Sequence, residues 1–182
     1  MMSRFLRIPA ALFPYLTVAT LLLILFDKEE DAAATAPVVL YIGIPVAFAV
    51  CMLCAVLATI LTAIGKGTAK EAARAVMIIK LVQIPAYIAI FVTGFFLSAF
   101  IFVFAIPLLL FLWLIDCATI LQTGILGIGS ALAARREGKM ISAEIILCAV
   151  IQFVFVVDVF AAIWLYLRVS SARKDPSLSE VL

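Results

Sequence analysis

The sequence predicts an all-α protein, a polytopic transmembrane helical bundle of five helices. Hydrophobic residues make up 68% of the 182 residues and charged residues 13%, whereas soluble domains are about 45–50% apolar and about 25% charged. The apolar residues form runs long enough to cross about 30 Å of hydrocarbon. No run alternates polar and apolar residues as a membrane barrel strand does. We therefore expect lipid to surround most of the chain.

Five apolar runs define the predicted helices, and they lie at about residues 8–26, 38–64, 76–100, 104–133 and 142–167. The third and fourth runs are separated only by a tight connection near Pro107, so we expect them to pack antiparallel. The first run resembles a secretory signal, whose removal would leave four helices. Its apolar core exceeds the usual ~7–15 residues, which favours a retained helix. We treat the chain as one integral membrane domain that ends in a short polar tail at 175–182.

Basic residues predict the orientation, because lysine and arginine accumulate on the cytoplasmic side of membrane helices. A cytoplasmic N-terminus in the plasma membrane places most of them inside: Arg4, Arg7, Lys66, Lys70, Arg74, Arg135, Arg136 and Lys139. The acidic first loop, residues 27–31, then lies outside. One group does not fit, because five crossings leave Arg168, Arg173 and Lys174 outside as well.

The composition excludes several classes of function. The chain has no histidine, which removes Ser-His and Cys-His catalysis, histidine-ligated haem and the zinc protease motifs. A net charge of +2 gives no reason to expect nucleic-acid binding. Cys51 and Cys54 have the spacing of a metal pair, but no second ligand pair accompanies them. We therefore interpret the four cysteines as packing residues and predict neither a metal nor a cofactor.

Two acidic residues inside apolar runs are the most informative polar positions. Asp116 and Asp158 each cost about 2.5–3.5 kcal/mol to insert near a helix centre, so each needs an inward partner or a wet cavity. Helical spacing places polar residues on one face of the third helix and on one face of the fourth. These residues are Lys80, Gln83 and Tyr87 on the third helix, and Asp116, Thr119 and Thr123 on the fourth.

Folding the third and fourth helices together predicts a polar seam, with Tyr87 or Thr119 near Asp116 and Gln83 near Thr123. We expect Lys80 to extend its ammonium group to the cytoplasmic interface. Folding the fourth helix against the fifth sets Asp116 level with Asp158, and Gln122 level with Gln152. Two facing carboxylates would form a proton or cation site or a catalytic dyad. The simpler interpretation, which we favour, is that these polar residues hold helices together.

Small residues follow one face of the second helix at four-residue spacing: Gly43, Ala47, Cys51 and Ala55. Such a row lets another helix approach closely. It predicts a packing seam within the bundle or between subunits.

Three segments resemble a family of short polytopic membrane proteins from Gram-positive bacteria that has no assigned activity. They are residues 79–87 (IKLVQIPAY), residues 111–124 around Asp116, and residues 152–159 around Asp158. The resemblance spans roughly the last two-thirds of the chain. It implies a membrane location and no mechanism.

Three classes of function remain. We favour a non-catalytic accessory or assembly component of a membrane complex, with the lipid bilayer and a partner subunit or a second copy as its partners. The alternative is a small proton- or cation-coupled carrier, or a transporter subunit, that uses Asp116 and Asp158. An intramembrane aspartyl protease is the remote third class, because the Gly-x-Gly-Asp motif of such enzymes is missing.

Overall fold

A computed structural model describes residues 5–26, 38–100, 102–154 and 157–172. These residues form one short π-helical turn and six α-helices, which confirms the all-α prediction. The elements are α2 (Ile8–Phe26), η1 (Val39–Gly43), α4 (Ile44–Ala63), α5 (Ala69–Phe100), α6 (Phe102–Arg136), α7 (Ser142–Ile151) and α8 (Val157–Ser171). Three segments are long and apolar enough to cross a membrane: Ile44–Ala63, Ala69–Phe96 and Leu109–Arg136.

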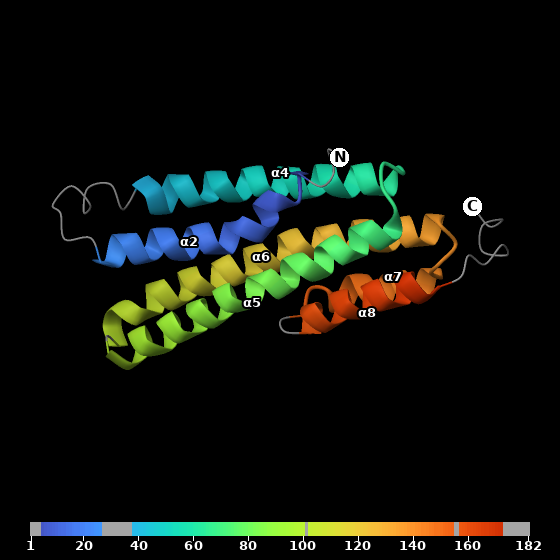
Figure 1. The fold of residues 1–182 in the computed structure, drawn as a ribbon. Coiled ribbons are helices and arrows are strands. Elements are labelled where there is room, and N and C mark those ends of the chain that lie inside the picture. The colour runs from blue at the N-terminus through green and yellow to red at the C-terminus, as the bar shows by residue number, and fades with distance from the viewer. Residues whose placement is uncertain (1–4, 27–37, 101, 155–156, 173–182) are drawn as a thin grey trace.

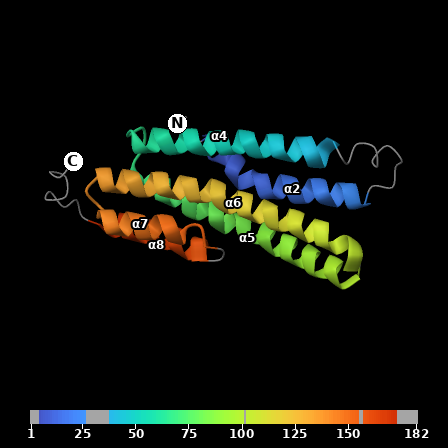
Figure 2. The ribbon, with the colours of Figure 1, turned by 180° about the vertical axis from the view of Figure 1, so that it is seen from behind.

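The helices lie in three layers around the long antiparallel pair α5 and α6 (Figure 1). Helices α2 and α4 cover one side of this pair, and α7 and α8 cover the other. The view from behind shows that α7 and α8 lie beside only one half of α5 and α6, the half nearest the connection from α4 (Figure 2). The other half of the central pair extends beyond them.

The first four predicted helices agree closely with the structure. The bounds of α2 match the prediction, and η1 and α4 together cover the second run. Helix α5 starts earlier than expected, at Ala69, because Thr68 and the carboxylate of Glu137 supply hydrogen-bond partners to its first N–H groups. The predicted tail at 175–182 lies outside the described residues.

The prediction of one continuous helix over 142–167 is wrong. The helix ends at Ile151, and the N–H groups of Phe153 and Val154 bond to carbonyls three residues earlier, at 3.2 and 3.1 Å. Helix α8 then runs back beside α7, and Arg168 bonds to Glu144 at 2.9 Å to close the base of this hairpin. The reversal brings Asp158 against α5, where Lys80 forms an ion pair with it. That ion pair stabilises the reversed position of α8.

Small side chains set the distance between α2, α4 and α6. Ala10, Ala55 and Ala58 are fully buried in one cluster, and a Cβ at Gly129 would lie 3.0 Å from Thr59 Cα. The small-residue row on the second helix follows this contact only in part. Cys51 and Ala55 are buried there, whereas Ala47 is half-buried and Gly43 lies exposed in η1.

Candidate functional site

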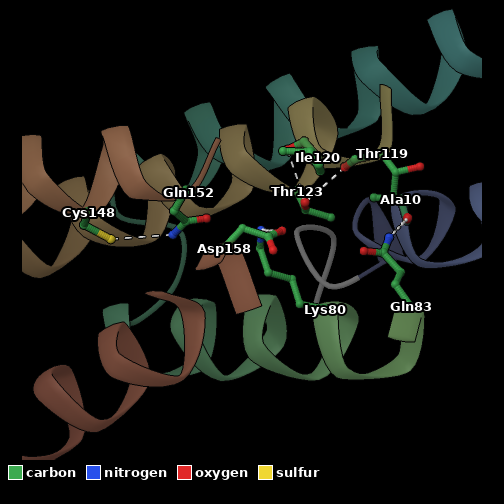
Figure 3. Close-up of polar contacts among 9 residues, drawn as sticks. All are labelled: Ala10, Lys80, Gln83, Thr119, Ile120, Thr123, Cys148, Gln152 and Asp158. Atoms are coloured by element: carbon green, nitrogen blue, oxygen red, sulfur yellow. Dashed lines mark hydrogen bonds and ion pairs between the residues drawn. The ribbon is translucent and has the colours of Figure 1, made fainter. Parts of the chain in front are cut away.

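An ion pair lies between the central helices and the hairpin. The Lys80 ammonium nitrogen on α5 is 2.6 Å from Asp158 Oδ2 on α8, and the two side chains are 1% and 3% exposed. Figure 3 shows the pair between the ribbons of α5 and α6, with Gln152 on one side and Gln83 on the other. This buried ion pair joins segments 78 residues apart in sequence.

The position of Asp158 in its helix adds to this contact. Asp158 stands in the first turn of α8, where the aligned peptide dipoles carry a partial positive charge. The carboxylate therefore has a positive helix end behind it and the ammonium group of Lys80 in front. Both the helix end and the ammonium group therefore attract the carboxylate electrostatically.

The expectation that Lys80 reaches the membrane interface is wrong. The hairpin covers this part of α5, and Lys80 is buried beneath it. A buried charge is tolerated only when it is paired and hydrogen-bonded. Asp158 provides that partner, and the lysine extends across the layer instead of along the helix.

Three fully buried glutamines belong to the same polar layer. Gln83 Nε2 donates to the Ala10 carbonyl on α2 at 2.7 Å, and Gln152 Nε2 lies 3.6 Å from Cys148 Sγ. Both amide atoms of Gln122 and the amide oxygens of Gln83 and Gln152 have no hydrogen-bond partner among the described residues. Buried amides of this kind generally bind ordered water or a polar ligand.

The two threonine hydroxyl groups of the predicted seam bond to their own helix. Thr119 donates to Ile115 O at 2.8 Å, and Thr123 donates to Thr119 O at 3.0 Å. Threonine can make this back-bond to the preceding turn. The predicted contact of Gln83 with Thr123 is thus replaced by hydrogen bonds to Ala10 and to Thr119, as Figure 3 shows.

The tip of the hairpin rests on two glycines of α6. A Cβ at Gly127 would lie 2.0 Å from Gln152 Oε1, and a Cβ at Gly124 would lie 2.8 Å from a ring carbon of Phe153. The side chains of the tip therefore occupy the space that larger residues on α6 would fill. This close approach fixes how deeply the hairpin enters the groove between α5 and α6.

Asp116 lies apart from the ion pair. It is half-buried, it lines a hollow of about 330 Å³ between α5 and α6, and its Oδ1 has no hydrogen-bond partner among the described residues. The expected depth match of Asp116 with Asp158 assumed a continuous fifth helix, whereas α8 runs back beside α7. Gln152 lies against Gly127 of α6, and its depth match with Gln122 stays a prediction. Tyr87, which the predicted seam puts near Asp116, is half-buried on α5, and its contact with Asp116 stays a prediction.

The chain matches a family of unknown function, DUF6652, over residues 3–171. It belongs to that family. No curated protein and no solved structure matches it. The family match therefore covers the ion pair, the hairpin and the hollow of this DUF6652 chain, and it assigns an activity to none of them.

In the described part of the DUF6652 chain, no group of three or more cysteine, aspartate or glutamate side chains is placed to hold a metal ion. Cys51 and Cys148 are buried, Cys54 and Cys117 are half-buried, and all four are free thiols. Their burial among apolar side chains fits a packing role.

Lys80 is the site residue that sequence reasoning misjudged. It shares a helical stripe with Gln83 and Tyr87, and its charge is opposite to that of the two acidic residues in the apolar runs. A lysine on the inward stripe of a helix could therefore have been matched with an aspartate from another helix. The choice between Asp116 and Asp158 required the path of the hairpin.

Proposed function

We propose that this chain is a non-catalytic integral component of the plasma membrane, an accessory or assembly subunit of a membrane complex. The Lys80–Asp158 ion pair carries the proposal. Its two charges bind one another at 2.6 Å, so neither is available as an open acid or base. Such a pair anchors the α7–α8 hairpin to the bundle, and this structural role is sufficient to explain why two charges are buried there.

Helix lengths support a topology of four crossings with a re-entrant hairpin. At about 1.5 Å per residue, the 10 residues of α7 and the 15 residues of α8 extend roughly 15 and 22 Å. Neither crosses about 30 Å of hydrocarbon. Helix α2, with 19 residues, extends about 28 Å and completes a set of four crossings with α4, α5 and α6. At the tip of the hairpin, Gln152 is fully buried against α6, whereas Phe153 and Val154 present exposed apolar side chains.

This topology accommodates the basic residues that five crossings left on the outside. With four crossings and a hairpin that returns, Arg168, Arg173 and Lys174 join the N-terminus and the loops at 64–68 and 137–141. The basic ends of the chain then share the cytoplasmic face. We also propose that the chain is bacterial, as its resemblance to membrane proteins of Gram-positive bacteria implies.

Exposed apolar faces give this component surfaces for lipid or a partner subunit. On α4 the outward side chains recur at three- and four-residue spacing, and they are Val46, Val50, Leu53, Leu57 and Ile60. A face of this kind packs equally well against acyl chains or another apolar helix.

The test is to extract the chain from native membranes into lipid nanodiscs and to determine the mass and composition of the complex. We expect a stoichiometric partner membrane protein or a defined homo-oligomer. The purified chain alone, reconstituted in liposomes, should carry no proton or Na⁺ flux. A flux through the isolated chain that Asp116→Asn abolishes, and that the matched control Glu144→Gln retains, would overturn the accessory role.

That outcome would establish the second candidate, a small ion-coupled carrier. The observation that favours it is the group of buried amide atoms at Gln83, Gln122 and Gln152, beside the end of an interrupted helix pair. Interrupted helices with polar groups at their ends form the substrate and ion sites of many transporters. The bond from Lys80 to Asp158 argues against the aspartyl protease, which needs two carboxylates held together.

A further inference from the structure

The groove between α5 and α6 continues past the hairpin tip. In one half of the bundle the hairpin fills this groove, with Gln152 and Phe153 seated on Gly127 and Gly124. The hollow that contains Asp116 lies farther along the same helices. The residues that line the hollow continue the three- and four-residue spacing of the residues beneath the hairpin. The hollow and the covered groove therefore lie on the same face of each helix. The residues that continue the stripes are Phe91, Gly94 and Phe95 on α5, and Leu109, Trp113 and Asp116 on α6.

The lining of this hollow combines one carboxylate with aromatic rings. Phe91 is 74% exposed and Trp113 is 61% exposed, so both rings are accessible from the surface of the bundle. Among the described residues, Asp116 is the one acidic residue that lines the hollow, and the lining includes no lysine or arginine. Its Oδ1 is buried without a hydrogen-bond partner in the same part of the chain. A cationic ligand would therefore meet one negative charge and no positive charge in this lining.

We propose that this hollow binds a lipophilic organic cation. The cationic centre would lie against the Asp116 carboxylate and over the faces of Phe91 and Trp113, where aromatic quadrupoles attract positive charge. The apolar substituents of the ligand would contact the remaining hollow and the surrounding acyl chains. A quaternary or delocalised cation suits the site because it enters an apolar environment with a smaller desolvation cost than an ammonium ion. This site goes beyond the proposed accessory role and does not depend on it.

The size of the hollow fits this class of ligand. About 330 Å³ is at the lower end of the ~300–1,000 Å³ range of small-molecule sites. Gly94 contributes to the space, because a Cβ there would lie 3.2 Å from Leu109 and narrow the hollow. A hydrophobic anion of the same shape would meet the Asp116 carboxylate and be repelled, which provides a matched control.

The two tryptophans of the chain allow binding to be measured at the site itself. Trp113 lines the hollow, whereas Trp164 lies on α8 beside a different surface depression. In the Trp164→Phe variant, Trp113 is the only tryptophan and reports on the hollow. In the Trp113→Phe variant, Trp164 reports on simple partitioning of a probe into the lipid.

The experiment titrates tetraphenylphosphonium, and in parallel the isosteric anion tetraphenylborate, into phosphatidylcholine nanodiscs that contain each variant. We expect saturable quenching of Trp113 by the cation alone, and only linear, unsaturable quenching of Trp164. On the Trp164→Phe background, Asp116→Asn should weaken binding of the cation by about tenfold or more. Glu144→Gln, which removes a carboxylate outside the hollow, should leave the affinity unchanged.

Equal saturable binding of the anion, or full affinity in Asp116→Asn, would overturn the proposal. If Asp116→Asn does not fold, Phe91→Leu decides the question. This change removes an exposed ring and retains the apolar volume, so it should weaken cation binding and leave the thermal stability unchanged. Unchanged affinity in Phe91→Leu would then reject the site. If the native chain binds no cation but still forms its membrane complex, the cation site is rejected and the accessory role is retained.

Discussion

The Lys80–Asp158 pair illustrates how a single contact can hold two charges away from water. Both side chains are almost completely buried, so each relies on the other for the stabilisation that water would give. Attraction within such a pair roughly offsets the desolvation of its members, whereas removal of one partner leaves the other charge uncompensated. The pair therefore contributes more to the position of the hairpin than to net stability.

Substitutions at this pair should show that asymmetry. Lys80→Met leaves Asp158 buried and unpaired, and we expect it to lower the unfolding free energy by about 3–5 kcal/mol. Adding Asp158→Leu to the same chain should restore most of that loss, because no charge remains in the core. Thermal unfolding in detergent measures both variants. A double variant that is as unstable as Lys80→Met would show that the stabilisation does not come from charge compensation.

The hairpin formed by α7 and α8 is closed at its base by Glu144. Its carboxylate accepts hydrogen bonds from Arg168 Nε at 2.9 Å and from the Ile141 N–H at 3.1 Å. Burial alone would raise the pKa of Glu144, but these hydrogen bonds and the charge of Arg168 outweigh it and lower the pKa from 4.5. The base of the hairpin is therefore bound most strongly while Glu144 is ionised.

The lowered pKa of Glu144 predicts a pH dependence for the hairpin. Its contribution should be complete above pH 4.5, the ordinary value, and lost as the pH falls through the lower pKa of the folded state. At about pH 7 we expect Glu144→Gln to lower stability by up to about 1 kcal/mol, since the pair is partly exposed to solvent. The difference from the native chain should shrink as the pH falls below 4.5. Parallel melting curves test this, with Glu71→Gln as the matched exposed control, and a difference that persists in acid would contradict it.

At the scale of the whole molecule, the reversal at the hairpin tip is the basis of the proposed four crossings. A continuous fifth helix would end opposite the loop at 64–68, whereas α8 ends at the same end of the bundle as that loop. Under the proposed topology, the N-terminus, the loops at 64–68 and 137–141 and the segment that follows α8 carry their basic residues on one side. The proposal therefore satisfies both the charge distribution and the short lengths of α7 and α8.

Cysteine labelling distinguishes the two topologies. In a chain whose four native cysteines are replaced by alanine, Lys66→Cys and Ser171→Cys each place one thiol at an exposed position. Under the proposed topology, a membrane-impermeant maleimide should label neither site in intact cells and both after the membrane is opened. Five crossings predict labelling of position 171 alone in intact cells, and that result would reject the re-entrant hairpin.

Much of the fold could be predicted from the sequence, and the main error was confined to the last predicted helix. The bounds of α2 and α4 followed from apolar runs and their flanking polar residues. The end of α7 had no comparable signal, because residues 152–156 are Gln-Phe-Val-Phe-Val and contain neither glycine nor proline. The one available indication was indirect, since Arg168, Arg173 and Lys174 lay on the wrong side of a five-helix chain.

The candidate site was predicted as a set of residues and not as a set of contacts. The notable polar residues Gln83, Gln122, Gln152 and Asp158 are all buried. Their partners were predicted by matching depths along continuous helices, and that method fails when a helix reverses. In the structure, Asp158 pairs with Lys80, and Asp116 lines a separate hollow.

The sequence by itself determined that this chain is helical, that its helices are apolar enough for lipid and which part of the chain each of the first four occupies. These properties follow from composition and spacing along a single segment, because each helix satisfies its own backbone. Only the tertiary structure decided that the last helix is broken and that Lys80 meets Asp158. A buried charge selects its partner by proximity in space, and proximity between residues 78 positions apart depends on where the chain turns back.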